Sequence, residues 1–293
     1  MSGPIFDAQL HTWAAEDASH PWDHQWPLES ATAKATFERM AREPAPFDEV
    51  VSWMDAVGVH GALLVSHRIY GFDNSYALET AARFPSRFRA VGLIDPAARD
   101  LRETMEAWLA RPDTAGFRIA FTGEKDLRAF RAGVYHSFFE TAQTLGCPVF
   151  VFPPKIVGEL APVARSFPEL RLVIDHFGMP QVPYSDANPD PFAGLPSLLE
   201  LARYDNVMVK ATALPFLAAE PFPFPDVWRH LHTVLDAFGI GRVMWGSDAT
   251  RVAASHSYAD AVEYVRQSSE LSEAEKGELL GGTLQRLVGW EAP

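Results

Sequence analysis

The sequence is poor in cysteine and in positive charge. Its single cysteine, Cys147, excludes an internal disulfide and argues against a thiolate zinc site, because such sites use two or more cysteines. Lysine and arginine number 25 against 38 acidic residues, so the formal net charge is −13. Nucleic acids and anionic membranes bind clustered Lys and Arg, and we expect neither as a partner. The expected partner is a small-molecule substrate, and homo-oligomerisation stays open.

Long apolar runs are also missing. No stretch approaches the roughly 20 apolar residues that a membrane-spanning helix needs. The N-terminus begins Met-Ser-Gly-Pro, without the basic and apolar segments of a secretory signal. These absences predict a soluble, cytoplasmic protein.

Three common catalytic signatures do not occur. The sequence has no Gly-x-Ser-x-Gly elbow and no phosphate-binding P-loop, and no Gly-x-Gly-x-x-Gly follows a predicted strand. The nearest match, Gly239-Ile240-Gly241, precedes a strand instead. Serine-hydrolase, kinase and dehydrogenase functions of these types are therefore disfavoured.

The sequence contains enough apolar residues to form a large core. Hydrophobic residues make up 47% of the chain and charged residues 22%, which is ordinary globular composition. A length of 293 residues suits two domains or one α/β barrel.

Strand-like and helix-like segments alternate along the whole chain. Short apolar runs predict eight strands, at residues 4–12, 61–67, 89–96, 115–121, 147–152, 170–176, 206–212 and 242–246. Apolar residues at helical spacing predict helices at residues 47–57, 74–84, 99–110, 135–145, 156–167, 195–204, 226–238, 257–267 and 272–287. Eight such units predict a (β/α)₈ barrel rather than a doubly wound sheet. We expect one domain over residues 1–293, with long loops after strands one, six and seven; the first, residues 13–46, is a candidate lid.

Polar side chains stand near the ends of these apolar strands. In a barrel the C-terminal ends of the strands meet around one axis, so side chains from different strands converge there. The residues concerned are Gln9, His11, His67, Asp95, Arg118, Asp175, His176, Lys210 and Asp248. Ionisable groups in such places need either partners or a function.

Each of the main candidates has two interpretations. Asp248 is a catalytic carboxylate or the cap of the next turn. His176 is a partner of Asp248 or a hydrogen-bonded core histidine. Lys210 meets a carboxylate of the protein or one of a ligand. Arg118 binds a substrate carboxylate or oxyanion, or forms a structural salt bridge for which Asp95 is the expected partner. His67 and His256 are treated as rim residues.

Four segments together resemble the amidohydrolase-2 family. They are residues 6–13 (Phe-Asp-Ala-Gln-Leu-His-Thr-Trp), 116–118 (Gly-Phe-Arg), 173–180 (Val-Ile-Asp-His-Phe-Gly-Met-Pro) and 244–248 (Met-Trp-Gly-Ser-Asp). The resemblance covers nearly the whole chain. It is nearest to the branch of 2-pyrone-4,6-dicarboxylate lactonases and L-fuconolactonase-like hydrolases. Residues 70–74 (Tyr-Gly-Phe-Asp-Asn) also resemble the 2-pyrone-4,6-dicarboxylate lactonases. It implies a TIM barrel, catalytic roles for His176 and Asp248, and a substrate contact for Arg118. Further predicted substrate-binding residues are Lys210, His11, Gln9, His67, Asn74 and Arg251.

The sequence departs from the family pattern at the expected metal ligands. Gln9-Leu10-His11 stands where the family has His-x-His, and the strand at 147–152 carries no histidine. Only His11, His176 and Asp248 remain as ligands for a divalent ion such as Zn²⁺ or Mn²⁺, and three protein ligands with a water can still hold Zn²⁺. We predict an enzyme without an essential metal cofactor, with one divalent ion as the alternative. Ala249-Thr250-Arg251 also replaces the Trp-Pro that follows the family's aspartate.

These observations predict a hydrolase that opens a small, carboxylated lactone, in aromatic or sugar-acid catabolism. Asp248 is the expected general base, and His176 steadies the oxyanion or protonates the leaving oxygen. One alternative is a metal-dependent decarboxylase or hydratase of the same superfamily. Another is a non-catalytic barrel that binds an anion.

Overall fold

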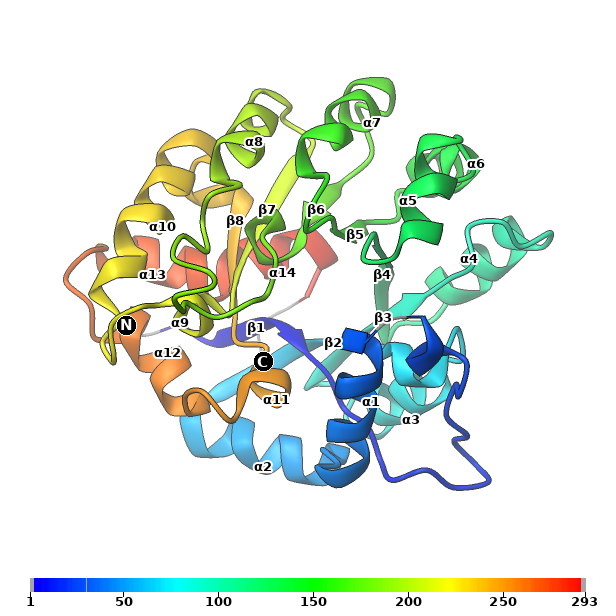
Figure 1. Ribbon diagram of the computed structural model, residues 1–293, viewed down its shortest axis with the longest axis horizontal. Coiled ribbons are helices and arrows are strands. Elements are labelled where there is room, and N and C mark those ends of the chain that lie inside the picture. Colours follow the sequence, from blue (N-terminus) through cyan, green and yellow to red (C-terminus); the bar gives the residue numbers. More distant parts are fainter. Residues whose placement is uncertain (1–2, 30, 291–293) are drawn as a thin grey trace.

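Eight parallel strands form a single sheet in which every strand lies beside the next one in sequence. The computed structural model describes residues 3–29 and 31–290. The strands are β1 (Ile5–Leu10), β2 (Val59–Val65), β3 (Phe88–Leu93), β4 (Thr114–Ala120), β5 (Val149–Phe152), β6 (Leu172–Ile174), β7 (Val207–Thr212) and β8 (Val243–Gly246). Helices ring the strands (Figure 1), and the predicted (β/α)₈ barrel is confirmed.

The strands bury side chains on both faces. Alternate residues such as Leu64 and Val209 join the large apolar cluster that also contains helix residues. The residues between them, such as Leu63 and Phe150, join a second cluster with Leu284, Leu287 and Trp290 at the C-terminal end of the described chain. Alternation along a strand sends neighbouring side chains to opposite faces, so the first cluster is the layer under the helices and the second fills the barrel.

The outer helices occupy the predicted segments. They are α2 (Phe47–Val57), α3 (Ser75–Arg83), α4 (Leu101–Leu109), α6 (His136–Thr144), α7 (Ala161–Ser166), α8 (Leu195–Leu199), α10 (Pro225–Phe238) and α12 (Tyr258–Arg266). The predicted helix at 156–167 is a 3₁₀ turn, η3 (Val157–Leu160), followed by α7. The one at 272–287 is divided into α13 (Glu273–Gly277), a π-helical turn (Glu278–Gly282) and α14 (Thr283–Val288).

Two connections predicted as loops contain helices. The candidate lid includes α1 (Ala31–Arg42), and the segment after β4 includes α5 (Glu124–Arg131). Both are rich in strong helix formers, but each is short of large apolar side chains at helical spacing, so periodicity did not identify them. Two short helices, α9 (Leu214–Leu217) and α11 (Ala249–Val252), directly follow β7 and β8.

The segment 13–46, which we call the lid segment, is docked beside the end of β2. Trp13 and Ala45 exchange two backbone hydrogen bonds of 3.0 Å, which close the base of the segment. Arg68, just after β2, reaches Asp23 at 2.7 Å and Glu29 at 3.1 Å. These contacts hold the lid segment over one side of the barrel mouth. No helix within the described ranges is long and apolar enough to cross a membrane.

Candidate active site

The C-terminal ends of five strands bring polar side chains together, as the barrel prediction requires. Gln9 and His11 come from β1, Arg118 from β4, Asp175 and His176 from the turn after β6, Lys210 from β7 and Asp248 from the turn after β8. All but Arg118 are buried. Water cannot solvate groups in this position, so their partners decide their charge.

Lys210 and Arg118 share one buried carboxylate. Lys210 Nζ lies 3.0 Å from Asp175 Oδ1, and Arg118 Nε donates to Asp175 Oδ2 at 2.7 Å. Lys210 therefore meets a carboxylate of the protein, the first of its two predicted alternatives. The expected pairing of Arg118 with Asp95 is wrong, because Asp95 is exposed and caps its own turn through the Ala97 N–H. Burial pushes the pKa of Asp175 upward, but Lys210 and Arg118 bring it below its ordinary value.

A second contact of Lys210 orients the side chains at the end of β1. Lys210 Nζ donates to Gln9 Oε1 at 2.8 Å, which turns the Gln9 amide nitrogen toward His11 Nε2 at 3.1 Å. His11 Nδ1 lies 2.7 Å from the Val65 carbonyl, so the hydrogen-bond network assigns its proton to Nδ1 and makes Nε2 an acceptor. Burial, only partly offset by Asp248, lowers the pKa of His11 to about 4 and keeps the ring neutral.

Asp248 and His176 have an unusual backbone conformation. Both have a φ of 54°, in the left-handed region that non-glycine residues seldom adopt. Asp248 Oδ1 lies 3.6 Å from His11 Nε2. Asp248 Oδ1 and His176 Nδ1 are buried atoms without a hydrogen-bond partner in the described chain. Strained backbone and unsatisfied polar atoms at one place are typical of a site that receives a ligand.

The charges of these two groups are fixed by opposing effects. Burial raises the pKa of Asp248, but Arg251, His176 and His11 together lower it below its ordinary value. Burial lowers the pKa of His176 to about 3 despite the nearby carboxylates of Asp248 and Asp175. At neutral pH the site therefore holds an ionised carboxylate beside a neutral imidazole.

Arg251 connects Asp248 to the loop after β6. Its Nε donates to Asp248 Oδ2, and its Nη2 donates to Gln181 Oε1 at 2.9 Å. Its guanidinium also lies 5.0 Å from the centre of the Phe216 ring. Arg39 of α1 belongs to the same charged region, because its pKa, lowered chiefly by burial, also responds to Arg251. Sequence analysis did not single out Gln181 or Arg39, since both lie in irregular or unpredicted segments.

The remaining predicted residues lie around this centre. The His67 ring is 5.2 Å from the His11 ring, and burial lowers its pKa well below the usual value. The Asn74 side chain spans to β3, where it donates to the Leu93 carbonyl at 2.9 Å and accepts from the Leu93 N–H at 2.8 Å. His256 pairs with Ser255 Oγ at 2.8 Å. Asn74 thus ties the start of α3 to the end of β3, and its substrate role stays a prediction.

The ligand set expected for a divalent ion is incomplete. Among residues 3–29 and 31–290, no group of three or more His, Cys, Asp or Glu side chains is placed to hold a metal. His11 Nε2, the atom that a metal would need, already accepts from Gln9, whereas Asp248 Oδ1 and His176 Nδ1 have no hydrogen-bond partner among the described residues. A catalytic zinc usually has three protein ligands. Because only two of the three expected ligands offer an unengaged atom, the residues as arranged here do not fit one.

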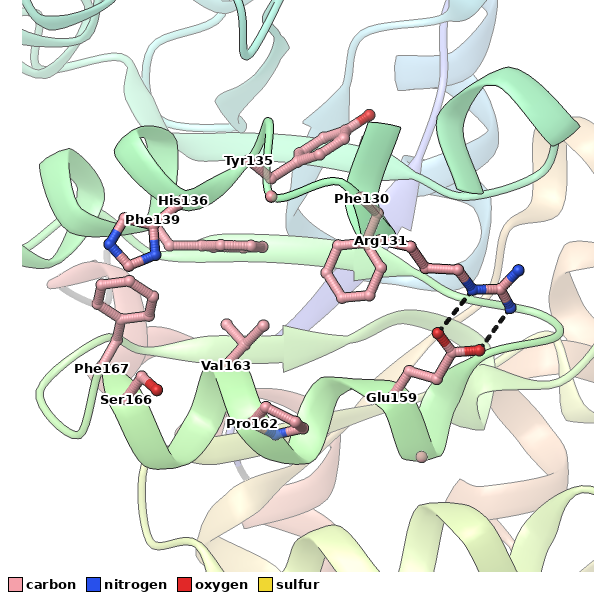
Figure 2. Close-up of a pocket in the computed structure, with 12 residues that line it drawn as sticks. Phe130, Arg131, Tyr135, His136, Phe139, Glu159, Pro162, Val163, Ser166 and Phe167 are labelled. Carbon is pink, nitrogen blue, oxygen red and sulfur yellow. Dashed lines mark hydrogen bonds and ion pairs between the residues drawn. The ribbon is translucent and has the colours of Figure 1, made fainter. Parts of the chain in front are cut away.

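A separate cavity of about 510 Å³ lies among the outer helices (Figure 2). Aromatic side chains of α5, α6 and the segment after α7 line it, and the Arg131 and Glu159 ion pair lies at one side. It shares no lining residue with the strand ends and contains no orphaned buried polar atom of the described chain. The barrel mouth, rather than this cavity, is therefore the candidate active site.

One protein family and several known proteins match most of this chain. The family described as Amidohydrolase matches residues 6–290. An L-fucono-1,5-lactonase of Burkholderia multivorans is 26% identical over 100% of this chain and 98% of its own. A 4-sulfomuconolactone hydrolase of Hydrogenophaga intermedia is 25% identical over 78% and 73% of the two chains. A crystal structure of an amidohydrolase from Burkholderia multivorans with bound zinc has a TM-score of 0.77, with 25% identity over 98% and 99% of the two chains.

Proposed function

Because this chain belongs to the amidohydrolase family, we propose that it is a hydrolase that opens a small lactone by attack of water. The observation that carries the proposal is the buried, ionised Asp248, whose Oδ1 has no hydrogen-bond partner among the described residues, beside the neutral His176. Two relatives that are named as lactone hydrolases support the reaction class.

In this mechanism Asp248 is the general base. A water held against Oδ1 gives its proton to the carboxylate while its oxygen attacks the lactone carbonyl. Arg251 occupies the other carboxylate oxygen, so only Oδ1 is free for this task. General base catalysis of this kind contributes about 10² to 10⁴ in rate.

His176 acts on the other side of the reacting carbonyl. As a neutral imidazole it has one ring N–H, which donates to the carbonyl oxygen as negative charge develops or to the leaving oxygen as the ring opens. The Phe152 ring lies 5.1 Å from the His176 ring and keeps water from that side. The proton that Asp248 took from water reaches the leaving oxygen as the ring opens, directly or by replacing the proton that His176 gave up. The products are a hydroxy acid, an ionised Asp248 and a neutral His176.

Arg118 is the anchor for a carboxylate on the substrate. Only its Nε is bound to Asp175, and the other two guanidinium nitrogens have no hydrogen-bond partner in the described part of the chain. Lys210 adds positive charge to this subsite while Asp175 and Gln9 hold it in place. Because the net charge of −13 repels anions, an anionic substrate needs these local cations in order to bind.

A panel of lactones tests the proposal, with each carboxylated lactone paired with its methyl ester. We expect turnover of at least one lactone, with kcat/KM higher for the acid than for its ester by about tenfold or more, because a charge-assisted bidentate contact is lost in the ester. In Arg118→Gln this preference should disappear, whereas in Arg131→Gln, a matched arginine that pairs with Glu159 outside the site, it should remain.

Two results contradict the proposal. If no lactone of the panel is hydrolysed but the acids still bind, the chain is an anion-binding barrel, the non-catalytic alternative. If acid and ester have equal kcat/KM, the reaction class stands and the carboxylate subsite is wrong.

A further inference from the structure

The first and last strands meet at a seam where the barrel closes. Every other pair of neighbouring strands is joined by a ladder of parallel pairs, and no such ladder joins β1 to β8 within residues 3–29 and 31–290. Here the Asp248 N–H donates to the Gln9 carbonyl at 2.9 Å. Gly246 permits the close approach, because a Cβ at this position would lie 3.2 Å from the Gln9 backbone nitrogen. Catalytic Asp248 therefore stands at the least regular junction of the sheet.

The side chain of Asp7 links the two strands at this seam. Its Oδ1 accepts from the backbone N–H groups of Gln9 and Ser247, both at 2.9 Å. Its Oδ2 accepts from the Ser247 hydroxyl and, at 2.9 Å, from the Tyr258 hydroxyl of α12. The residue is fully buried. Four donors to one buried carboxylate make a strong and directional clamp between β1, β8 and α12.

Three of the four bonds of the clamp end at a residue of the site or next to one. Ser247 immediately precedes Asp248, and its hydroxyl also accepts from the Ala249 N–H at 3.0 Å, so Asp248 is flanked on both sides. A left-handed backbone at Asp248 persists only when its surroundings impose it, and these contacts do so. On the other strand, a register irregularity between Asp7 and Leu10 turns Asp7 toward β8 while Gln9 faces Lys210.

We propose that Asp7 is a positioning residue for the reaction. Through Ser247 it fixes the Asp248 carboxylate, and through the Gln9 N–H it fixes the chain of hydrogen bonds from Lys210 to His11. The clamp thus sets the distance between the base and the polar groups that face it across the seam. This role rests on the proposed function, since it assumes that Asp248 is the base.

Kinetics of clamp variants test the proposal. Asp7→Asn keeps an oxygen for the two backbone N–H groups but replaces the oxygen that the two hydroxyls use, and Tyr258→Phe removes one donor alone. We expect kcat to fall by about tenfold or more in Asp7→Asn and by a smaller factor in Tyr258→Phe, with KM within about twofold, because misplacing a base by about 1 Å costs up to 10² in rate. Asp7→Ala should be slower than Asp7→Asn, so that the conservative variant rescues activity.

The control is Asp113→Asn, which alters another buried aspartate, paired with Arg111 at 2.8 Å before β4. It should lower the melting temperature without lowering kcat. A second readout needs no substrate: amide hydrogen exchange at residues 244–252 should be faster in Asp7→Asn and Asp7→Ala than in the wild type, and unchanged in Asp113→Asn.

Wild-type kcat in Asp7→Asn, or an equal loss of kcat in Asp113→Asn, would overturn the positioning role. Unchanged hydrogen exchange at residues 244–252 would do the same. If the wild type hydrolyses no lactone, it is the proposed function that fails, and the exchange experiment still decides whether Asp7 holds the backbone of Asp248.

Discussion

At the scale of single residues, Asp248 and His176 are distinguished by backbone and side chain together. Each has a left-handed backbone and a buried polar atom without a partner in the described chain. The sequence predicted both as site residues, because each follows an apolar strand and the C-terminal ends of barrel strands converge on one axis. It could not predict that Arg251 would bind Asp248, since that contact depends on how α11 turns after β8.

The contacts of Asp7 could not be predicted from the sequence pattern. Strict alternation along a strand predicts that Asp7 shares a face with Gln9 and His11. The irregularity between Asp7 and Leu10 instead lets Asp7 reach Ser247 and Tyr258. A bulge of this kind leaves no mark on the hydrophobic pattern of so short a strand, so the clamp became visible only in three dimensions.

The same residue gives a prediction for stability against pH. Burial raises the pKa of Asp7 from 3.8 to about 6, although four hydrogen bonds oppose the shift. A raised folded-state pKa means that the contribution to stability is complete below the unfolded-state pKa and is lost as pH rises through about 6. The unfolding free energy of the wild type minus that of Asp7→Asn should therefore fall by about 3 kcal/mol between about pH 4 and pH 7.

Denaturant titrations of both proteins at several pH values measure this difference directly, because the other titrating groups are common to the two. A difference that is constant across the range would show that Asp7 keeps an ordinary pKa in the folded protein. The expected trend also means that the stability deficit of Asp7→Asn relative to the wild type is smaller at neutral pH than at pH 4.

At the scale of elements, periodicity found the helices with a continuous apolar face and missed α1 and α5, which have few large apolar side chains. The predicted helix at 47–57 has the same bounds as α2, whose Val50 and Met54 are buried against the sheet. In α1, Phe37 and Met40 are the only large apolar side chains, so the pattern of a packed face is absent. The lid segment was predicted from its length rather than from any helical pattern.

Strands β1 and β5 also bear on whether the site holds a metal. The Gln9 amide, oriented by Lys210, donates to the very lone pair that His11 would offer to a metal, and β5 supplies no histidine. A relative holds zinc, so a divalent ion is the principal alternative for this chain. We predict that activity survives exhaustive chelation and that the purified protein carries well under one equivalent of zinc, manganese or iron.

Elemental analysis alongside the lactone assay measures this. The matched variant is Gln9→His, which restores the second imidazole and should raise the bound zinc above the wild-type level. Loss of wild-type activity on chelation, recovered with one divalent ion per chain, would make the metal-dependent mechanism correct and would revive the decarboxylase or hydratase alternative.

At the scale of the whole molecule, the barrel explains why residues separated by more than 200 positions form one site. Lys210 contacts Gln9, and Ser247 contacts Asp7, because the first and last strands close the same sheet. The fold was predictable from the alternation of segments, since eight units of this kind have few packings open to them. The pairing of buried charges was not predictable. Arg118 and Lys210 lie close to Asp175 across the barrel but far from it along the chain.

The most direct test of the account concerns Asp248 as the base of a lactone hydrolase. Hydrolysis of the best lactone of the panel should be followed for the wild type and for Asp248→Asn, with circular dichroism to establish that both are folded. The account predicts an unchanged spectrum and a kcat at least about 10² lower in Asp248→Asn, because the amide cannot take a proton from water. A folded Asp248→Asn that hydrolyses the lactone at the wild-type rate would contradict it.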